Sequence, residues 1–326
     1  MLRIVTYHRV AELKDTPTVD CRSVSATPSS FARQMRHLVR YYHVVSMPEV
    51  LDAVERNRPL AERSVLITFD DAYADFADIA WPILRRFRLP ATVFVPTAYP
   101  DHPELAFWWD KLFQAFARTS RTELRETPIG PLPLATPDQR RSSLRALQGH
   151  VTTLSHAQAM RLVDSICAQL VESPVRGGSV LSWDQLRQLR LDGVTLGAHT
   201  RTHPLLTQLP PDKIREEVKG SQQDLKREIG AALPIFCYPG GDHNDAVTAI
   251  LKEEGIQLGF TTLIGKNELD ATDLLRLRRI GVTPRSSLPI FCLRLLRLGI
   301  YLDAWRYQKR REPSTQDLLP SQASFV

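Results

Sequence analysis

The pattern of apolar and polar residues in the N-terminal part predicts short strands that alternate with helices. The run from Ser64 to Phe69 is almost continuously apolar, which is typical of a strand buried on both faces of a parallel sheet or barrel. In residues 31–42 the apolar side chains recur every 3.6 residues, which indicates an amphipathic helix with Ser29 or Ser30 as its N-cap. Strands are expected at residues 3–7, 43–46, 64–69 and 91–95, and helices at residues 31–42 and 47–54. A further helix is expected after the strand at 64–69 and ends at about residue 86.

The rhythm changes between residues 102 and 181, where two apolar stripes at helical spacing flank a proline-rich stretch. We therefore expect a mostly helical insertion with a loop between its helices. The alternating pattern then resumes. Strands are expected at residues 194–198, 234–238 and 256–262, and helices at residues 182–191, 214–229 and 246–254. Alternating units on this scale favour an α/β barrel over an open sheet.

Composition narrows the class of protein. Of the 326 residues, 43% are hydrophobic and 24% are charged, which is typical of a globular chain and disfavours a disordered, collagen-like or disulfide-stapled one. The net charge of +6 permits an anionic partner without requiring one, and we expect no nucleic-acid partner. The N-terminus lacks the apolar run of a secretory signal and the four cysteines form no CxxC pair, so we expect a cytoplasmic protein with free thiols.

Two carboxylates follow the most apolar strand of the chain. Asp70 and Asp71 stand where α/β folds place their active sites, at the carboxyl ends of the strands. The alternative interpretation is a helix N-cap with a neighbouring turn residue. On this segment alone the two interpretations are equally good.

Two histidines follow a later strand. His199 and His203 are four residues apart, so that both can face one way on a helical turn and bind a metal. A structural role for both is the alternative. Together with one aspartate they make three protein ligands and leave positions for water and substrate, and the second aspartate is then available as a general base.

These segments resemble the motifs of polysaccharide deacetylases, the NodB-homology family (carbohydrate esterase family 4). Thr68–Asp71 is similar to the family's TFDD motif, and His199–Pro204 to its H-[ST]-x-x-H-P motif. The segment Leu89–Val95 resembles the strand that follows the first motif, and Tyr7–Val10 resembles the opening of a subgroup with an N-terminal YH strand.

The resemblance implies a distorted (β/α) barrel that removes an N-acetyl group from an amino sugar of a polysaccharide, an oligosaccharide or a lipid-linked glycan. It implies that Asp71, His199 and His203 bind a divalent metal, most often zinc, with cobalt or nickel as alternatives. It also implies that Asp70 takes a proton from the metal-bound water. We expect one catalytic domain over residues 1–311, interrupted at about 102–181, and a flexible tail at 312–326.

The third family motif, R-x-P-[YF], is altered. Cys237 stands in the position of its arginine and cannot make a charged hydrogen bond, whereas Gly240 still offers a backbone N–H for an oxyanion hole. Arg279, in a segment that resembles a later family strand, is a candidate replacement for the missing guanidinium. A surface or phosphate-facing arginine is the alternative.

The general acid is open between two residues. Many members use a late histidine in an L-x-H motif, and no such histidine follows His243. His8 ends a predicted strand at the same rim as the other candidates, and His243 lies in the loop after the third motif. We prefer His8 because the segment around it matches the subgroup.

Two further features have structural alternatives. The aromatic residues at 107–109 either stack on a sugar or, as we prefer, belong to a core. The basic amphipathic stretch at 288–311 either contacts an anionic membrane, at its inner face for a cytoplasmic protein, or, as we prefer, covers the barrel.

The alternatives to a deacetylase are a metal-dependent hydrolase of another amide or ester, and an inactive sugar- or lipid-binding protein on the same scaffold, which the Cys237 departure motivates. A non-haem iron oxygenase has a similar ligand set, but the barrel and the additional Asp70 argue against it. The absent signal suggests a cytoplasmic precursor as substrate, such as a lipid-linked one in exopolysaccharide synthesis.

Overall fold

In the computed structural model the described residues are 1–13, 20–102, 104–173, 175 and 179–296. The tail expected at 312–326 lies outside them. The barrel strands and the strand beside them are β1 (Arg3–Tyr7), β4 (His43–Val45), β5 (Ser64–Phe69), β6 (Thr92–Val95), β9 (Thr195–Ala198), β10 (Ile235–Cys237), β11 (Leu258–Ile264) and β12 (Leu277–Gly281). The short strands are β2 (Arg9–Val10), β3 (Val24–Ala26), β7 (Glu123–Leu124) and β8 (Leu132–Pro133). The α-helices are α1 (Pro28–Tyr41), α2 (Met47–Glu55), α3 (Trp81–Phe87), α4 (Trp108–Arg118), α5 (Pro137–Val151), α6 (His156–Leu170), α7 (Trp183–Leu191), α8 (Pro211–Ile229), α9 (Asp245–Glu253) and α10 (Leu288–Leu295).

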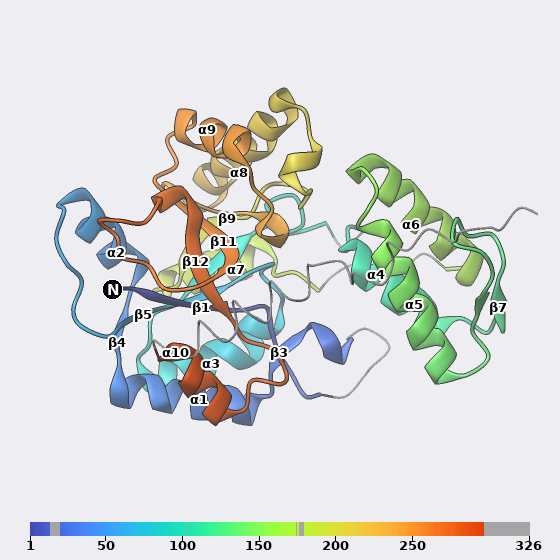
Figure 1. Cartoon of the computed structure of the whole chain (residues 1–326), viewed down its shortest axis with the longest axis horizontal. Coiled ribbons are helices and arrows are strands. Elements are labelled where there is room, and N and C mark those ends of the chain that lie inside the picture. Colours follow the sequence, from blue (N-terminus) through green and yellow to red (C-terminus); the bar gives the residue numbers. More distant parts are fainter. Residues whose placement is uncertain (14–19, 103, 174, 176–178, 297–326) are drawn as a thin grey trace, which may run out of the picture.

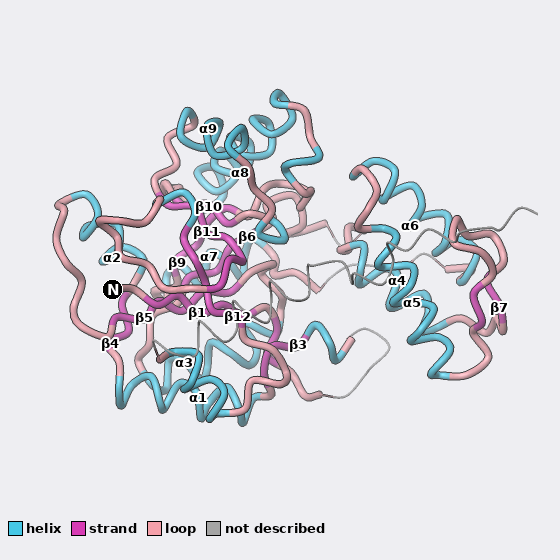
Figure 2. The backbone as a smooth tube through the Cα atoms, viewed as in Figure 1, coloured by secondary structure: helices cyan, strands magenta, loops and turns pink. Residues whose placement is uncertain are grey.

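Seven parallel strands close into a barrel. The hydrogen-bonded order is β1-β12-β11-β10-β9-β6-β5, and β5 pairs back with β1 over the full length of β1. Figure 2 shows these strands gathered at the centre of the fold with helices around them. The predicted (β/α) barrel is confirmed, and the boundaries of the apolar runs agree closely with those of the strands.

The strand β5 has two neighbours on its second edge. β4 pairs with its first half, at Ser64–Leu66, and β6 pairs with its second half, at Thr68 and Phe69. Every residue of β5 is buried, because strands and helices cover it on all sides. This explains why Thr68 is the one polar residue after Ser64 in this strand, and its hydroxyl donates to the Val5 carbonyl inside the barrel.

Alternation along the strands separates the barrel interior from the surface that packs against helices. Val65, Ile67 and Phe69 belong to the core that includes α1 and α3, whereas Leu66 packs in the inner core with Ile4 and Leu277. Since side chains alternate with a period of two, residues 68 and 70 point inward after Leu66, and residue 279 points inward after Leu277. The barrel topology thus directs residues of distant segments to one interior.

Between β6 and β9 the chain leaves the barrel and forms a lobe of α4, α5, α6 and the antiparallel pair β7–β8 (Figure 1). The lobe has a hydrophobic cluster of its own, formed by residues such as Leu112, Phe116, Leu147 and Ile166. The insertion is mostly helical as predicted, and the proline-rich stretch expected to be a loop contains β8, which pairs with β7 just before that stretch.

Polar side chains cap the N-termini of several helices. Ser46, Thr136, Ser155 and Ser182 each form a capping box. The expected N-cap of the first helix was wrong. Thr27 is the N-cap, and its side chain accepts a hydrogen bond from the Ser30 N–H. The helix starts at Pro28 because proline fits the first helical position, where no N–H is needed.

The helix α10 covers the barrel at α1, as preferred from the sequence for this stretch. Phe291 and Leu295 are buried, and the Arg3 side chain donates to the Leu295 carbonyl. The continuation at 297–311 lies outside the described residues. Of the helices that are described, none combines the length and apolar character needed to cross a membrane.

We predict that Gly259→Ala lowers the free energy of unfolding by about 1–3 kcal/mol through overpacking. A Cβ on Gly259 would lie 2.8 Å from the Tyr238 hydroxyl and press against the Leu275 carbonyl. A Cβ on Gly149, inside α5, meets no heavy atom within 4 Å, so Gly149→Ala should raise that free energy by about 0.5–1 kcal/mol. Urea unfolding of both variants tests this, and equal effects would contradict the packing.

Candidate active site

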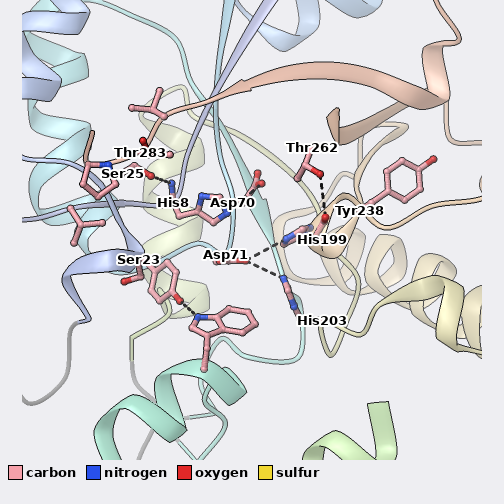
Figure 3. A pocket seen from close by; sticks show the side chains of 16 residues that line it. His8, Ser23, Ser25, Asp70, Asp71, His199, His203, Tyr238, Thr262 and Thr283 are labelled. Carbon is pink, nitrogen blue, oxygen red and sulfur yellow. Dashed lines mark hydrogen bonds and ion pairs between the residues drawn. The ribbon is translucent and has the colours of Figure 1, made fainter. Parts of the chain in front are cut away.

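One cavity of about 410 Å³ opens at the carboxyl ends of the barrel strands. Residues at the ends of β1, β5, β9, β10, β11 and β12 line it, together with Ser23, the start of β3 and part of the lobe (Figure 3). The sequence-predicted residues at this cavity are His8, Asp70, Asp71, His199, His203 and Gly240. The structure therefore brings together candidates that are far apart in the chain.

Asp71, His199 and His203 form a compact buried group. The Nε2 atoms of His199 and His203 each lie 3.3 Å from Oδ1 of Asp71. This oxygen is buried and makes no hydrogen bond of good geometry. Burial raises the pKa of Asp71, but contacts with the two histidine side chains outweigh it and hold this pKa well below its usual range. The carboxylate is therefore ionised and available as a ligand.

The ring of His199 is oriented by the backbone of β10. Its Nδ1 atom lies 2.8 Å from the Cys237 carbonyl oxygen, which can only accept a hydrogen bond. In the neutral imidazole the proton is then on Nδ1, and the Nε2 lone pair is available to a cation. Without a cation, the Cys237 and Asp71 contacts outweigh the effect of burial and raise the pKa of His199 well above its usual value. A histidine held in this way by a carbonyl oxygen is typical of metal ligands. Two nitrogens and a carboxylate oxygen around one point fit a divalent cation, which would balance the buried negative charge.

The turns that carry these ligands have unusual backbone geometry. Asp71 (φ 71°), Ala72 (φ 50°), Thr200 (φ 63°) and His203 (φ 61°) are all left-handed, although none is glycine. Such conformations persist only where surrounding contacts enforce them. Here the chain returning from the lobe supplies part of that constraint, because the Leu181 N–H donates to the Ala72 carbonyl.

Asp70 is held from inside the barrel by Arg279. The guanidinium donates from Nη1 to Oδ1 at 2.8 Å and from Nη2 to Oδ2 at 2.7 Å. It also donates to the Thr261 carbonyl and the Thr6 hydroxyl. Burial raises the pKa of Asp70, but the Arg279 charge outweighs this effect and keeps the pKa below its usual value. Arg279 is therefore a buried partner of Asp70, which excludes the surface interpretation.

Cys237 lies at the same inner surface. Ligand atoms of Asp70, His199 and Cys237 come within 4.8 Å of one another. This second group is a poorer metal site, because Arg279 already engages both oxygens of Asp70, and burial raises the pKa of the Cys237 thiol and keeps it protonated. The Cys237 side chain is small, and the Arg279 side chain from β12 lies next to it.

The two candidate acids differ in position. His8 lines the cavity, is partly exposed, and has its Nε2 3.9 Å from Oδ2 of Asp70. The Nδ1 atom of His243 lies 2.7 Å from the Gly241 carbonyl and its ring lies against Tyr238, and His243 is not among the residues that line the cavity. The geometry favours His8 for contact with a substrate.

The lobe completes one wall of the cavity. Trp109 donates from Nε1 to the Tyr73 hydroxyl at 3.0 Å, and this hydroxyl donates to Asp110 at 3.1 Å. Burial raises the pKa of Asp110 to about 7. The rings of Phe107 and Trp109 stack on each other and meet His203 edge-on. Of the three aromatic residues expected in a core, Phe107 is buried and Trp108 packs in the lobe, whereas Trp109 lines the cavity.

Several lining residues were not identified from the sequence. Thr283 and Pro284 follow β12, so the rule that functional residues follow parallel strands would have indicated them. Ser23 and Ser25 precede α1, and Tyr73 follows the carboxylates. Hydroxyl residues in such places have no distinctive spacing, and no sequence signal would have selected them.

Comparison with known proteins identifies relatives over most of the chain. The family model described as polysaccharide deacetylase matches residues 57–259. YxkH of Bacillus subtilis (strain 168), a protein assigned to the polysaccharide deacetylases, is 20% identical over 246 residues, which are 76% of this chain and 61% of YxkH. A protein of Escherichia coli (strain K12) named poly-beta-1,6-N-acetyl-D-glucosamine N-deacetylase is 30% identical over 100 residues, which are 30% of this chain and 14% of that protein. The chain thus spans less than two thirds of the length of these curated relatives.

Solved structures show the same fold. The deacetylase PplD of Streptococcus pyogenes, solved in complex with acetate, superposes with a TM-score of 0.63 at 21% identity and covers 90% of this chain and 98% of PplD. IcaB from Ammonifex degensii superposes with a TM-score of 0.58 at 19% identity and covers 90% of this chain and 97% of IcaB. At these identities the likeness concerns the fold.

We predict that Arg279→Gln lowers the free energy of unfolding of the metal-free protein by about 3–5 kcal/mol at neutral pH, because it leaves the Asp70 carboxylate buried and unpaired. Without the guanidinium, only the weaker effects of His8 and His199 oppose the effect of burial on Asp70, so its pKa should rise. A raised pKa favours folding at low pH, so the difference from the unsubstituted protein should narrow as the pH falls toward the ordinary aspartate value of about 3.9.

Urea unfolding at neutral and at mildly acidic pH measures this difference. Arg278→Gln is the matched control, since Arg278 is the exposed neighbour on the same strand, and its effect should stay within about 0.5 kcal/mol. A loss for Arg279→Gln that is the same at both pH values would show that Asp70 is not the group concerned.

Proposed function

Because the chain belongs to the polysaccharide deacetylase family, we propose that it is a metal-dependent hydrolase that removes the N-acetyl group from an amino sugar. The observation that carries this proposal is the buried Asp71 oxygen, which lies 3.3 Å from two imidazole nitrogens beside a second carboxylate. The Escherichia coli relative is named for deacetylation of an N-acetylglucosamine polymer. An N-acetylated glycan or its lipid-linked precursor is therefore the substrate class we propose.

Asp71, His199 and His203 would hold the cation, for which we propose zinc. One carboxylate and two imidazoles are a common zinc set, and cobalt or nickel would be accepted by the same donors. When bound, the ion supplies Lewis-acid polarisation of the acetamide carbonyl and makes water more acidic. The lone pair of His199 is presented for this purpose by the Cys237 carbonyl.

Asp70 would act as the general base. It lies in the same cavity as the metal ligands, and its low pKa keeps it ionised. Arg279 holds both carboxylate oxygens and would take the role of the arginine that Cys237 replaces. A bidentate pair fixes the plane of the carboxylate. This contact also counters the alternative of an inactive scaffold protein, because the altered third motif leaves Asp70 with a partner.

His8 and Gly240 would act on the substrate itself. His8, partly exposed at the cavity wall, would give a proton to the departing amine. The N–H of Gly240 would stabilise the negative charge that develops on the carbonyl oxygen. An amide needs the proton because its nitrogen is a poor leaving group until it is protonated. It needs the N–H donor because its carbonyl carbon is a poor electrophile.

A cytoplasmic location is proposed together with a precursor substrate. No disulfide joins the cysteines in the described part of the chain, as suits a reducing compartment. A reporter fused to the chain and found to be active only outside the cytoplasm would contradict this location.

We predict that Asp70→Asn retains the bound metal but lowers kcat for acetate release by about 100-fold or more, since a general base contributes 10²–10⁴-fold. Asp71→Asn should lose both metal and activity. Metal analysis of the purified variants, combined with acetate release from N-acetylglucosamine oligomers, distinguishes the two roles. Full activity in Asp70→Asn would show that the base is wrongly assigned, and one equivalent of metal in Asp71→Asn would do the same for the ligand set.

A second prediction separates His8 from His243. His8→Ala should lower kcat for the amide substrate by about 100-fold, but should affect an aryl acetate ester far less, because a phenolate leaves without being protonated. His243→Ala should change both rates little. Equal losses of His8→Ala on the amide and on the ester would show that His8 is not the acid.

A further inference from the structure

One side of the barrel is covered by three neighbouring helices that contain no acidic residue. α1 contacts both α3 and α10, and Figure 1 shows the three together along the lower edge of the molecule. They contain three, two and one arginines respectively, and no aspartate or glutamate. We call this surface the basic face. By contrast, α8 on another side of the barrel has five acidic and five basic residues.

The arginines of α1 are not neutralised by nearby carboxylates. Arg33, Arg36 and Arg40 are exposed. Within the described part of the chain, no carboxylate oxygen lies within ion-pair distance of any of them. An uncompensated set of charges on a rigid helix attracts an anionic partner more strongly than a mixed surface does.

The basic face also exposes apolar side chains. On α10 and at its end, Ile290 is 41%, Leu293 44% and Leu296 50% exposed. Tyr41 of α1 is 44% exposed, and its ring lies 4.8 Å from that of His37, which contacts Cys292 of α10. Basic and apolar groups therefore occur side by side on two packed helices.

We propose that the basic face docks on the surface of a bilayer that contains anionic phospholipids. Arginines with exposed aliphatic and aromatic groups fit the boundary between headgroups and acyl chains. A nucleic acid would use the charges but gives no role to Ile290, Leu293 and Leu296. A second copy of the chain would bring the exposed arginines of two α1 helices together, and these charges repel each other. In the sequence, residues 297–311 add five basic residues and one acidic residue directly after this face.

Docking in this way would bring the catalytic cavity to the membrane. The segment Val282–Pro284 lines the cavity and leads into α10, and the segment Ser23–Ser25 lines it and leads into α1. Two of the three helices of the basic face, α1 and α10, therefore start a few residues from the rim of the cavity. A sugar attached to a lipid would reach Asp70 and Asp71 from the bilayer surface. This consequence rests on the proposed function, whereas the docking does not.

Sedimentation of the full chain with vesicles tests the docking. We expect binding to vesicles of phosphatidylcholine mixed with phosphatidylglycerol, little binding to phosphatidylcholine alone, and weaker binding at high salt. The triple variant Arg33→Gln, Arg36→Gln, Arg40→Gln should lower the partition coefficient roughly 100-fold, at about fivefold for each arginine near the surface.

The matched control removes the same charge from α8, as Lys213→Gln, Lys219→Gln, Lys226→Gln, and should change the partition coefficient by no more than a few fold. A second pair tests the apolar part. Leu293→Glu should weaken binding, whereas Leu191→Glu, at an exposed leucine of α7, should not. Circular dichroism and acetate release from a soluble oligosaccharide check that each variant is folded.

Three results would overturn the proposal: no binding to either vesicle, equal binding to both, or equal losses in the α1 and α8 triple variants. If the chain does not bind vesicles, two other results would assign the basic face to another partner. One is concentration-dependent dimerisation that is lost in Leu293→Glu, and the other is DNA binding that is lost in the α1 triple variant. Acetate release plays no part in the binding measurement, so docking and the deacetylase reaction can fail separately.

Discussion

The ion pair between Asp70 and Arg279 is the contact on which the catalytic end of the barrel depends. Burying two charges is costly, and the cost is met only where good geometry and further hydrogen bonds are present. Arg279 has both, since it also reaches a carbonyl of β11 and a hydroxyl of β1. The pair thus ties β5, β1 and β12 together at the level where the cavity begins. Any shift in the register of these strands would separate the charges, so the pair helps to select one arrangement of the barrel.

Above this pair the structure maintains strained turns. Asp71 and His203 both have left-handed backbones, and their side chains converge on one point. Neighbouring contacts hold these turns, from the chain that returns out of the lobe and from the aromatic rings that meet His203. Although the lobe has a hydrophobic core of its own, it also contributes to the cavity, because it supplies Trp109 and the contacts that fix one wall.

Much of the site follows from short sequence patterns. Asp70, Asp71, His199 and His203 each follow an apolar run, and parallel strands in one barrel place their carboxyl ends at one rim. Such reasoning predicts which residues belong to the site, but not which side chains they contact. The contact of Arg279 with Asp70 joins residues 209 positions apart, and sequence patterns alone left a surface arginine equally acceptable. The choice between His8 and His243 also needed the cavity, since both follow predicted strands.

The sequence by itself predicted the strands, several helix ends, the helical character of the insertion and the residue types of the proposed metal group. These depend on local spacing, on capping and on the alternation of apolar residues, which act over a few positions. The tertiary structure alone decided which side chains face the barrel interior together, which of three adjacent aromatic residues lines the cavity, and where the uncompensated arginines gather. These depend on strand order and register across the closed barrel, where residues far apart in the chain become neighbours, and no short pattern records such distances.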